Sequence, residues 1–365
     1  MCSVRRAHRA GVPHLPHAPG DAGVASLMQR ALRLAARAAG RTSPNPMVGA
    51  VLVRAGVVVG EGFHRRAGEP HAEVLALRQA GAASDGATLY VTLEPCSHHG
   101  RTPPCTDSII AAGVTRVVAA MEDPDPRVAG SGFACLRAAG IEVLVGEGAA
   151  QARRLNRWYI TCRTLGRPRV LYKWAASLDG AVAPVGRASG RISGEASARA
   201  VHRLRDRLDA VIVGVGTVLA DDPRLTVRLV RGRNPLRVVA DRQARTPVTA
   251  RVLPALICTG PAVPAARLEA LVRAGAEVVC APRPADILAE LHRRGHLGVL
   301  LEGGPRLAAA FWSAGLVDEV AAVIAPRLQG GGVPALAGPG AAALPLHDVR
   351  LRRIGDDLWV TGAIR

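Results

Sequence analysis

Four residues in the first third of the chain combine types and spacing that suit zinc chemistry. His71 and Glu73 form an H-x-E triplet, Cys96 follows a proline, and Cys105 comes after eight intervening residues. Zinc-dependent deaminases carry H-x-E followed by P-C-x-x-C, so the order matches while the cysteine spacing is wider. One imidazole and two thiolates can hold Zn²⁺ and leave its fourth position to water. Glu73 is then expected to carry a proton from that water to the substrate's ring nitrogen and departing amine.

Two other interpretations of these residues stay open on the sequence alone. A structural zinc site needs a fourth protein ligand, which His98 or His99 could supply. Glu73 would have no task in such a site. A disulfide between Cys96 and Cys105 is the second alternative, and a reducing compartment disfavours it.

The segments around these residues alternate between short apolar strands and helices. Helices are predicted over residues 27–39, from about His71, and over 106–112, 130–138 and 149–164, and strands over 48–53, 57–59, 88–92, 116–120 and 142–145. This alternation predicts an α/β sheet covered by helices. It also places His71 and Cys105 near helix starts, where the helix dipole favours a thiolate.

Gly166 and Pro168 break the chain and mark a domain boundary. We expect an arm over residues 1–26, rich in Arg, His, Pro and Gly, a first domain over 27–165 and a second α/β domain over 166–365. The second domain is expected to contain a helix over 195–206 and strands over 170–176, 210–214, 236–240, 256–259, 276–280, 298–301 and 319–324. After one strand, the pair Gly214 and Gly216 lets the backbone approach a ligand closely, and after another, the turn at Gly303 and Gly304 can aim backbone N–H groups at an anion. Neither is the G-x-G-x-x-G fingerprint, so a Rossmann domain is not indicated.

Composition narrows the class of partner. Lys and Arg number 47 against 29 Asp and Glu, a net charge of +18, but aromatic residues make up only 3%. Basic residues spread along the chain with few aromatics favour small phosphorylated ligands over nucleic acid. Seven cysteines, an odd number, do not form a secreted disulfide scaffold, so a reducing cytoplasm is expected. No apolar run reaches the length of a membrane span, and no membrane partner is expected.

Three stretches together resemble one known family. They are TSPNPMVGAV at residues 42–51, GEPHAE at 68–73 and TLEPCSHHGRTPPC at 92–105, the last with the wide cysteine spacing. They are similar to the bifunctional riboflavin biosynthesis deaminase/reductase family, and the similarity extends over residues 28–365. The resemblance implies a cytidine-deaminase-like α/β/α domain followed by a dihydrofolate-reductase-like α/β domain. The first would deaminate 2,5-diamino-6-(5-phosphoribosylamino)pyrimidin-4-one to 5-amino-6-(5-phosphoribosylamino)uracil, and the second would reduce the ribosyl group to ribityl with NADPH.

The resemblance also implies roles for individual residues. Zinc ligands are His71, Cys96 and Cys105, and Glu73 is the catalytic proton shuttle. Substrate contacts are expected from Asn45, His64, Arg101, Asp125, Ser189, Arg205, Leu225, Arg228 and Glu302. Contacts to the NADPH cofactor are expected from Ala175, Arg191, Thr217, Asp221, Arg242, Gly304, Pro305, Arg306, Leu307, Ala308, Ala309 and Ala310. A homo-oligomer, dimeric or tetrameric, is usual in the family.

Three positions depart from the family's pattern. Asp125 stands where Asn is usual, and an ionised Asp offers no donor and adds negative charge. Arg191 replaces a frequent Trp on the nicotinamide side, and Arg242 replaces a small Ser near the cofactor. Two further hypotheses are a zinc deaminase acting on nucleic-acid bases, with an inactive or regulatory nucleotide-binding second domain, and a structural-zinc protein with such a second domain.

Overall fold

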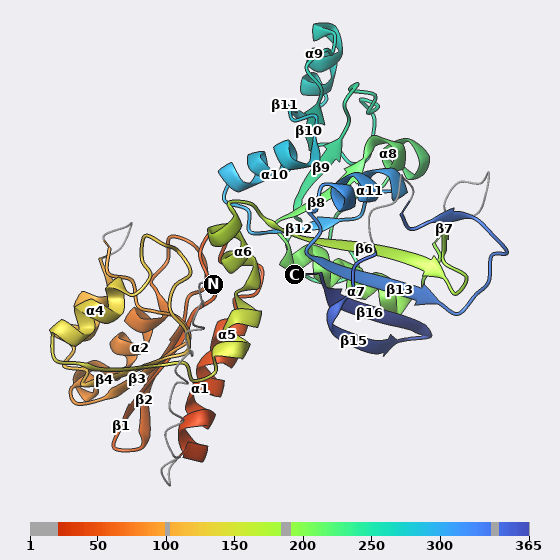
Figure 1. The fold of residues 1–365 in the computed structure, drawn as a ribbon. Coiled ribbons are helices and arrows are strands. Elements are labelled where there is room, and N and C mark those ends of the chain that lie inside the picture. Colours follow the sequence, from red (N-terminus) through yellow and green to blue (C-terminus); the bar gives the residue numbers. More distant parts are fainter. Residues whose placement is uncertain (1–20, 99–102, 184–190, 337–342, 365) are drawn as a thin grey trace, which may run out of the picture.

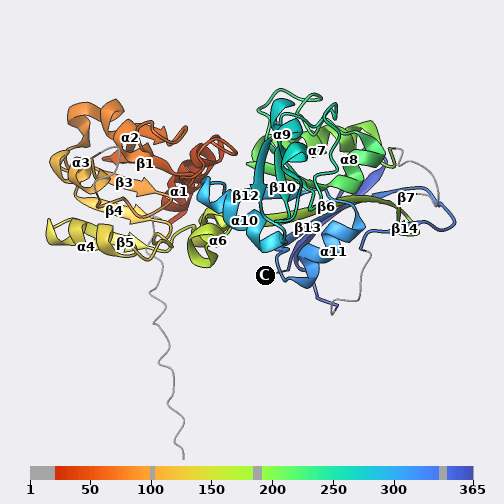
Figure 2. The ribbon, with the colours of Figure 1, turned by 90° about the horizontal axis from the view of Figure 1, so that it is seen from above.

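The computed structural model describes residues 21–98, 103–183, 191–336 and 343–364 and places them in two bodies, each built on its own main sheet. Both views show the bodies side by side, with α6 (Arg157–Leu165) between them (Figure 1, Figure 2). Strands up to Val145 belong to the first main sheet, and strands from Arg169 onwards belong to the second body. The predicted α/β class in two parts is confirmed. No described helix is both long and apolar enough to cross a lipid bilayer.

The first sheet has five strands in the order β2-β1-β3-β4-β5. The strand β1 pairs antiparallel with β2 and β3, whereas β3, β4 and β5 run parallel. The strands are β1 (Gly49–Arg54), β2 (Val57–Phe63), β3 (Thr88–Val91), β4 (Arg116–Ala119) and β5 (Glu142–Val145). The accompanying helices are α1 (Asp21–Ala36), α2 (Ala72–Ala80), α3 (Cys105–Ala111), α4 (Ser131–Ala138) and α5 (Ala149–Leu155), with a 3₁₀ turn at Gly81–Ser84.

Two glycines let helices pack closely on opposite faces of this sheet. A Cβ on Gly49 would lie 2.1 Å from the Ala31 carbonyl oxygen of α1, and a Cβ on Gly60 would lie 2.1 Å from the Ala76 carbonyl oxygen of α2. Gly60 pairs with Leu52, three residues from Gly49 on β1. Because side chains alternate along a strand, the two glycines face opposite sides and the body has three layers.

The second main sheet has nine strands in the order β11-β10-β9-β8-β12-β6-β13-β16-β15. The first seven strands of this order, from β11 across to β13, are parallel to one another. The strands β16 and β15 pair antiparallel at the far edge of the sheet. Its strands are β6 (Arg169–Ser177), β8 (Ala210–Gly214), β9 (Leu236–Ala240), β10 (Leu256–Thr259), β11 (Glu277–Cys280), β12 (Gly298–Leu301), β13 (Glu319–Ala325), β15 (His347–Ile354) and β16 (Asp357–Ala363). The helices of this body are α7 (Glu195–Arg207), α8 (Val215–Asp221), α9 (Ala265–Arg273), α10 (Pro284–Arg293) and α11 (Pro305–Ser313). A separate pair joins β7 (Ala181–Ala183) to β14 (Val333–Pro334).

Several boundaries differ from the predicted ones. The helix expected over residues 27–39 begins at Asp21 and ends at Ala36, so residues 21–26 belong to α1 and not to an unstructured arm. Residues 1–20 lie outside the described part. The long helix expected over 149–164 is two helices, α5 and α6, which meet at Asn156. The buried Asn156 side chain accepts a hydrogen bond from the Met47 N–H at 2.8 Å and donates one to the Met47 carbonyl at 2.9 Å. A tertiary contact of this kind competes with helix continuity and leaves no periodicity in the sequence.

Candidate active sites

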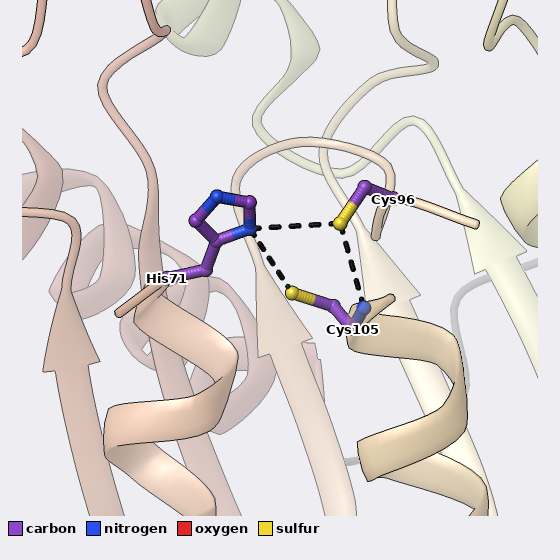
Figure 3. Close-up of side chains that lie close together, drawn as sticks. All are labelled: His71, Cys96 and Cys105. Atoms are coloured by element: carbon purple, nitrogen blue, oxygen red, sulfur yellow. Dashed lines mark hydrogen bonds between the residues drawn. The ribbon is translucent and has the colours of Figure 1, made fainter. Parts of the chain in front are cut away.

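Three predicted zinc ligands converge at one point of the first body (Figure 3). His71 is the N-cap of α2, Cys96 lies in the loop after β3, and Cys105 is the first residue of α3. The His71 Nδ1 atom lies 3.2 Å from the Cys105 Sγ and 3.5 Å from the Cys96 Sγ. All three ligand atoms lie within 4.8 Å of one another. Both thiols are free, so the disulfide alternative is not formed.

The electrostatics of this cluster suit a divalent cation. A hydrogen bond from the Cys105 side chain lowers the pKa of Cys96 to about 4, and His71 acts in the same direction. The same hydrogen bond raises the pKa of Cys105, which keeps the proton that the two sulfurs share. The Cys105 N–H also points to the Cys96 Sγ at 3.4 Å. A nitrogen and two sulfurs that converge in this way are the donor set of a catalytic zinc site.

Glu73 stands beside the cluster on the first turn of α2. Its side chain is buried, and its Oε2 atom has no hydrogen-bond partner among the described residues. Burial raises the pKa of Glu73, while the nearby His71 acts in the opposite direction. A buried carboxylate oxygen without a partner is costly unless a ligand or water completes it. This observation supports a ligand-binding position next to the cluster.

A fourth protein ligand is not found in the described part of the chain. His98 is exposed and does not belong to the cluster. His99 lies outside the described residues, as does Arg101, a predicted substrate contact. The described geometry is therefore that of a three-ligand site, which leaves a coordination position open.

The cluster opens into a cleft of about 640 Å³. Two predicted substrate residues, Asn45 and His64, line it together with His71 and Glu73. The Asn45 Nδ2 lies 3.0 Å from the His64 Nε2, and the His64 Nδ1 lies 3.2 Å from the Pro70 carbonyl. Burial lowers the pKa of His64, and the two contacts fit a ring whose Nε2 accepts from Asn45 and whose Nδ1 donates to Pro70.

Asp125 lines the same cleft, and its charge is compensated. Arg127 donates to both carboxylate oxygens of Asp125, at 3.0 and 2.6 Å, and the Arg163 Nε lies 3.6 Å away. The hydrogen bond from Arg127 lowers the pKa of Asp125 to about 2. The added negative charge at this position is therefore neutralised by two arginines that the sequence reasoning did not identify.

Tyr159 and Asp123 are further lining residues that the sequence did not reveal. The Tyr159 hydroxyl donates to Asp123 Oδ1 at 3.1 Å, and the guanidinium of Arg163 lies 5.1 Å from the centre of the Tyr159 ring. Tyr159 and Arg163 are four residues apart on α6, so they share one helical face. Their only sequence signal was that spacing, because α6 reaches the cleft through tertiary packing.

In the second body, a buried ion pair joins two predicted substrate residues. Arg205 of α7 donates to both carboxylate oxygens of Glu302, at 2.7 and 2.8 Å. Lys173 of β6 lies close enough for its charge to act on Glu302, and burial lowers the pKa of Lys173. No motif in the sequence singled out Lys173.

The other predicted substrate residues of this body lie near the same helix. The His202 Nδ1 accepts the Arg228 N–H at 2.9 Å, and burial lowers the pKa of His202 to about 4, with help from the charges of Arg205 and Arg228. Leu225 is buried with φ +53°, a left-handed conformation that leucine rarely adopts. Ser189 lies outside the described residues.

The residues predicted for the cofactor gather at the carboxyl ends of parallel strands. They are Ala175 near the end of β6, Thr217 and Asp221 on α8 after β8, Arg242 after β9, and Gly304, Pro305, Arg306, Leu307, Ala308, Ala309 and Ala310 at the start of α11 after β12. A Cβ on Gly304 would lie 3.4 Å from the Thr217 Oγ1, so the starts of α8 and α11 adjoin. Ligands of open α/β sheets bind at this edge. Arg191 is exposed, and its charge acts on His202.

Two family models match the two bodies. Residues 24–121 match the cytidine and deoxycytidylate deaminase zinc-binding region, and residues 168–360 match the RibD C-terminal domain.

Similar proteins cover nearly the whole chain. The riboflavin biosynthesis protein RibD of Aquifex aeolicus is 42% identical to this chain, and the match covers 91% of this chain and 92% of that protein. RibD of Escherichia coli is 44% identical, and the match covers 83% of this chain and 88% of that protein. A solved structure of Acinetobacter baumannii RibD has a TM-score of 0.86 at 36% identity and covers 94% of this chain and 99% of its own. A diaminohydroxyphosphoribosylaminopyrimidine deaminase/5-amino-6-(5-phosphoribosylamino)uracil reductase from Thermotoga maritima has a TM-score of 0.83 at 35% identity, with the same coverage. The chain therefore belongs to the RibD family of riboflavin biosynthesis proteins.

Proposed function

We propose that the chain is a bifunctional enzyme of riboflavin biosynthesis. Residues 27–165 form a zinc-dependent domain that hydrolyses the 2-amino group of 2,5-diamino-6-(5-phosphoribosylamino)pyrimidin-4-one and releases ammonia. Residues 166–365 form a reductase domain that converts the ribosyl group of the product, 5-amino-6-(5-phosphoribosylamino)uracil, to ribityl with NADPH. The observation that carries the proposal is the convergence of one imidazole nitrogen and two sulfurs beside a buried carboxylate with an unpartnered oxygen.

In the deaminase half, His71, Cys96 and Cys105 would hold zinc, and the metal would supply the activation of a water as nucleophile. Glu73, whose Oε2 has no partner among the described residues, would accept a proton at that oxygen and pass it to the ring nitrogen and then to the leaving amine.

Asn45 and Asp125 line the cleft and orient the pyrimidine, with His64 holding Asn45 in place. Asn45 is held by the His64 Nε2, so its amide presents a fixed face to the substrate. Asp125 stays ionised between Arg127 and Arg163 and acts as a hydrogen-bond acceptor. Arg101, which lies outside the described residues, stays a predicted substrate contact of this half.

In the reductase half, hydride transfer is the chemistry that NADPH supplies. The starts of α8 and α11 bind the cofactor through Thr217 and the segment that begins at Gly304. Arg205 keeps the Glu302 carboxylate ionised and fixed beside Lys173, where it meets the ribosyl group.

The substitution Glu73→Gln separates the two activities. It removes the proton carrier while leaving His71, Cys96 and Cys105 unchanged. Ammonia release should therefore fall about 10³-fold or more, since acid–base groups usually contribute about 10²–10⁴-fold to the rate. Zinc content by metal analysis should stay at one per chain. The matched control is Glu142→Gln, a half-exposed glutamate on β5, which should behave as wild type.

The same variant tests the second reaction. Supplied with the deaminated intermediate, the Glu73→Gln protein should consume NADPH at the wild-type rate. If wild type and variant both fail to consume NADPH with that intermediate, the reductase assignment is refuted. If Glu73→Gln deaminates normally, the zinc cluster is structural and the deaminase mechanism is refuted.

The nucleic-acid alternative is not favoured, because RibD proteins match this chain across both domains. We also propose a homo-oligomer. The support is the family resemblance, since dimers and tetramers are usual in the family; the exposed edge strand β15 mixes Val349 and Leu351 with Arg350, Arg352 and Arg353 and is not an apolar surface. Light scattering coupled to size exclusion would give the mass in solution.

A further inference from the structure

One segment of the deaminase cleft is attached to the reductase half. The segment comprises residues 40–47, between α1 and β1, and we call it the anchored loop. It carries Asn45, which lines the cleft next to His64. Loops are ordinarily the more mobile parts of a protein, so the position of Asn45 depends on what holds this loop.

The beginning of the anchored loop packs on the last turn of α7. A Cβ on Gly40 would lie 2.6 Å from the Arg207 Cα, so only glycine permits this approach. Arg41 donates to the Asp206 carbonyl at 3.0 Å and to the Asp206 carboxylate at 2.7 Å. Arg233 of the second body donates to the Gly40 carbonyl at 2.5 Å. The partners in these contacts, Arg207, Asp206 and Arg233, belong to the reductase half.

The middle of the anchored loop is bound to a second carboxylate of the reductase half. The Ser43 hydroxyl donates to Asp209 Oδ2 at 2.9 Å, and Asp209 is buried. The same oxygen accepts the backbone N–H groups of Leu297 and Gly298, at 2.8 and 3.1 Å, so it is fixed in place at the amino end of β12. A rigid acceptor gives Ser43 a defined position.

From there the loop leads directly into the cleft. The Asn45 N–H donates to the Thr42 carbonyl at 2.8 Å, which closes a turn between the anchored residues and Asn45. Beyond Asn45, the Asn156 side chain holds both backbone groups of Met47. Asn45 thus lies between one attachment on the reductase half and one on its own half.

We propose that Asp206 and Asp209 of the reductase half are positioning residues for deamination, because they hold the loop that presents Asn45 to the pyrimidine. The inference rests on the proposed deaminase function. It gives α7 a contact with each half: Asp206 anchors the deaminase loop, and the neighbouring Arg205 binds Glu302 in the reductase half.

The test releases the loop without touching either carboxylate. In the full-length protein, Arg41→Gln combined with Ser43→Ala removes the side-chain contacts to Asp206 and Asp209. The KM of deamination should rise about five- to tenfold, the range that one or two lost hydrogen bonds carry, while kcat changes less than twofold. Zinc content and the kinetic constants of NADPH consumption with the deaminated intermediate should stay at wild-type values. Arg54→Gln, at an exposed arginine that ends β1, is the matched control.

Two measurements separate positioning from a general structural role. With Arg41 unchanged, the single variant Ser43→Thr keeps the hydroxyl and should keep the wild-type KM of deamination. The single variant Ser43→Ala should raise that KM. Hydrogen exchange of the Asn45 amide should accelerate at least tenfold in the double variant, with the amides of β3 unchanged. An unchanged KM in the double variant, or a parallel loss of kcat, zinc and both activities, would overturn the proposal. Absence of ammonia release from the wild-type protein would instead refute the proposed function itself.

Discussion

Replacement of Glu302 by Gln should destabilise the reductase half by about 3 kcal/mol. The side chains of Arg205 and Glu302 are only 11% and 12% exposed, and they form a two-point ion pair with Lys173 nearby. Removal of one partner from a buried pair leaves an uncompensated charge, which costs about 3–5 kcal/mol. Gln keeps the shape and one acceptor oxygen, so the lower end of that range is expected.

Urea unfolding followed by tryptophan fluorescence reports on the reductase half, where this change in stability is expected. The tryptophans of the chain lie in the second body or in the helix beside it, at Trp158, Trp174, Trp312 and Trp359. With a slope of about 2–3 kcal/mol per molar urea, the midpoint should fall by about 1 M. The control Glu277→Gln breaks an ion pair whose glutamate is 59% exposed and should cost less than about 1 kcal/mol.

The pH dependence provides the decisive check. Burial by itself would raise the pKa of Glu302, but the charges of Arg205 and Lys173 outweigh it and lower the pKa. A lowered folded-state pKa means that the stabilisation is present above the unfolded value, about 4.3, and is lost as the pH falls through the folded value. The difference between wild type and Glu302→Gln should be constant from pH 5 to 8 and shrink below about pH 4. A difference below about 1 kcal/mol at pH 7 would show that the pair is solvated and that the reasoning is wrong.

Three further outcomes are expected. Asn156→Ala leaves the N–H and the carbonyl of Met47 without their partner, so it should lower the free energy of unfolding by about 2 kcal/mol and reduce ammonia release. Calorimetry measures the first effect and the deaminase assay the second. The pKa of His202 is lowered to about 4, so the unfolded chain binds a proton more readily than the folded one, and the free energy of unfolding should fall by about 1–3 kcal/mol as the pH drops from 6.5 to 4. His202→Asn keeps an acceptor for the Arg228 N–H and should remove that part of the pH dependence, measured by urea unfolding at several pH values. Zinc removal with a strong chelator should abolish ammonia release, leave NADPH consumption with the deaminated intermediate intact, and be reversed by added Zn²⁺.

The zinc cluster was readable in the sequence because its geometry is largely local. His71 and Glu73 are two residues apart at the start of one helix, so their relative position follows from the helix itself. Cys96 follows a strand and Cys105 begins the next helix, and adjacent elements of an α/β body bring such ends together. The strands were predictable for the same reason, since buried parallel strands are short apolar runs between breakers.

Tertiary structure alone decided the features that join distant segments. Asn156 interrupts the helix expected over residues 149–164 because its amide matches a backbone 109 residues away. Arg163 adds its charge to that of Arg127 beside Asp125, and the link from Arg41 to Asp206 ties the two bodies together across 165 residues. No periodicity or motif encodes such pairs, because a salt bridge or amide contact constrains only the two ends that meet. The sequence by itself thus determined which residues could hold a metal and carry a proton, and the packing of α6 and α7 determined what surrounds them.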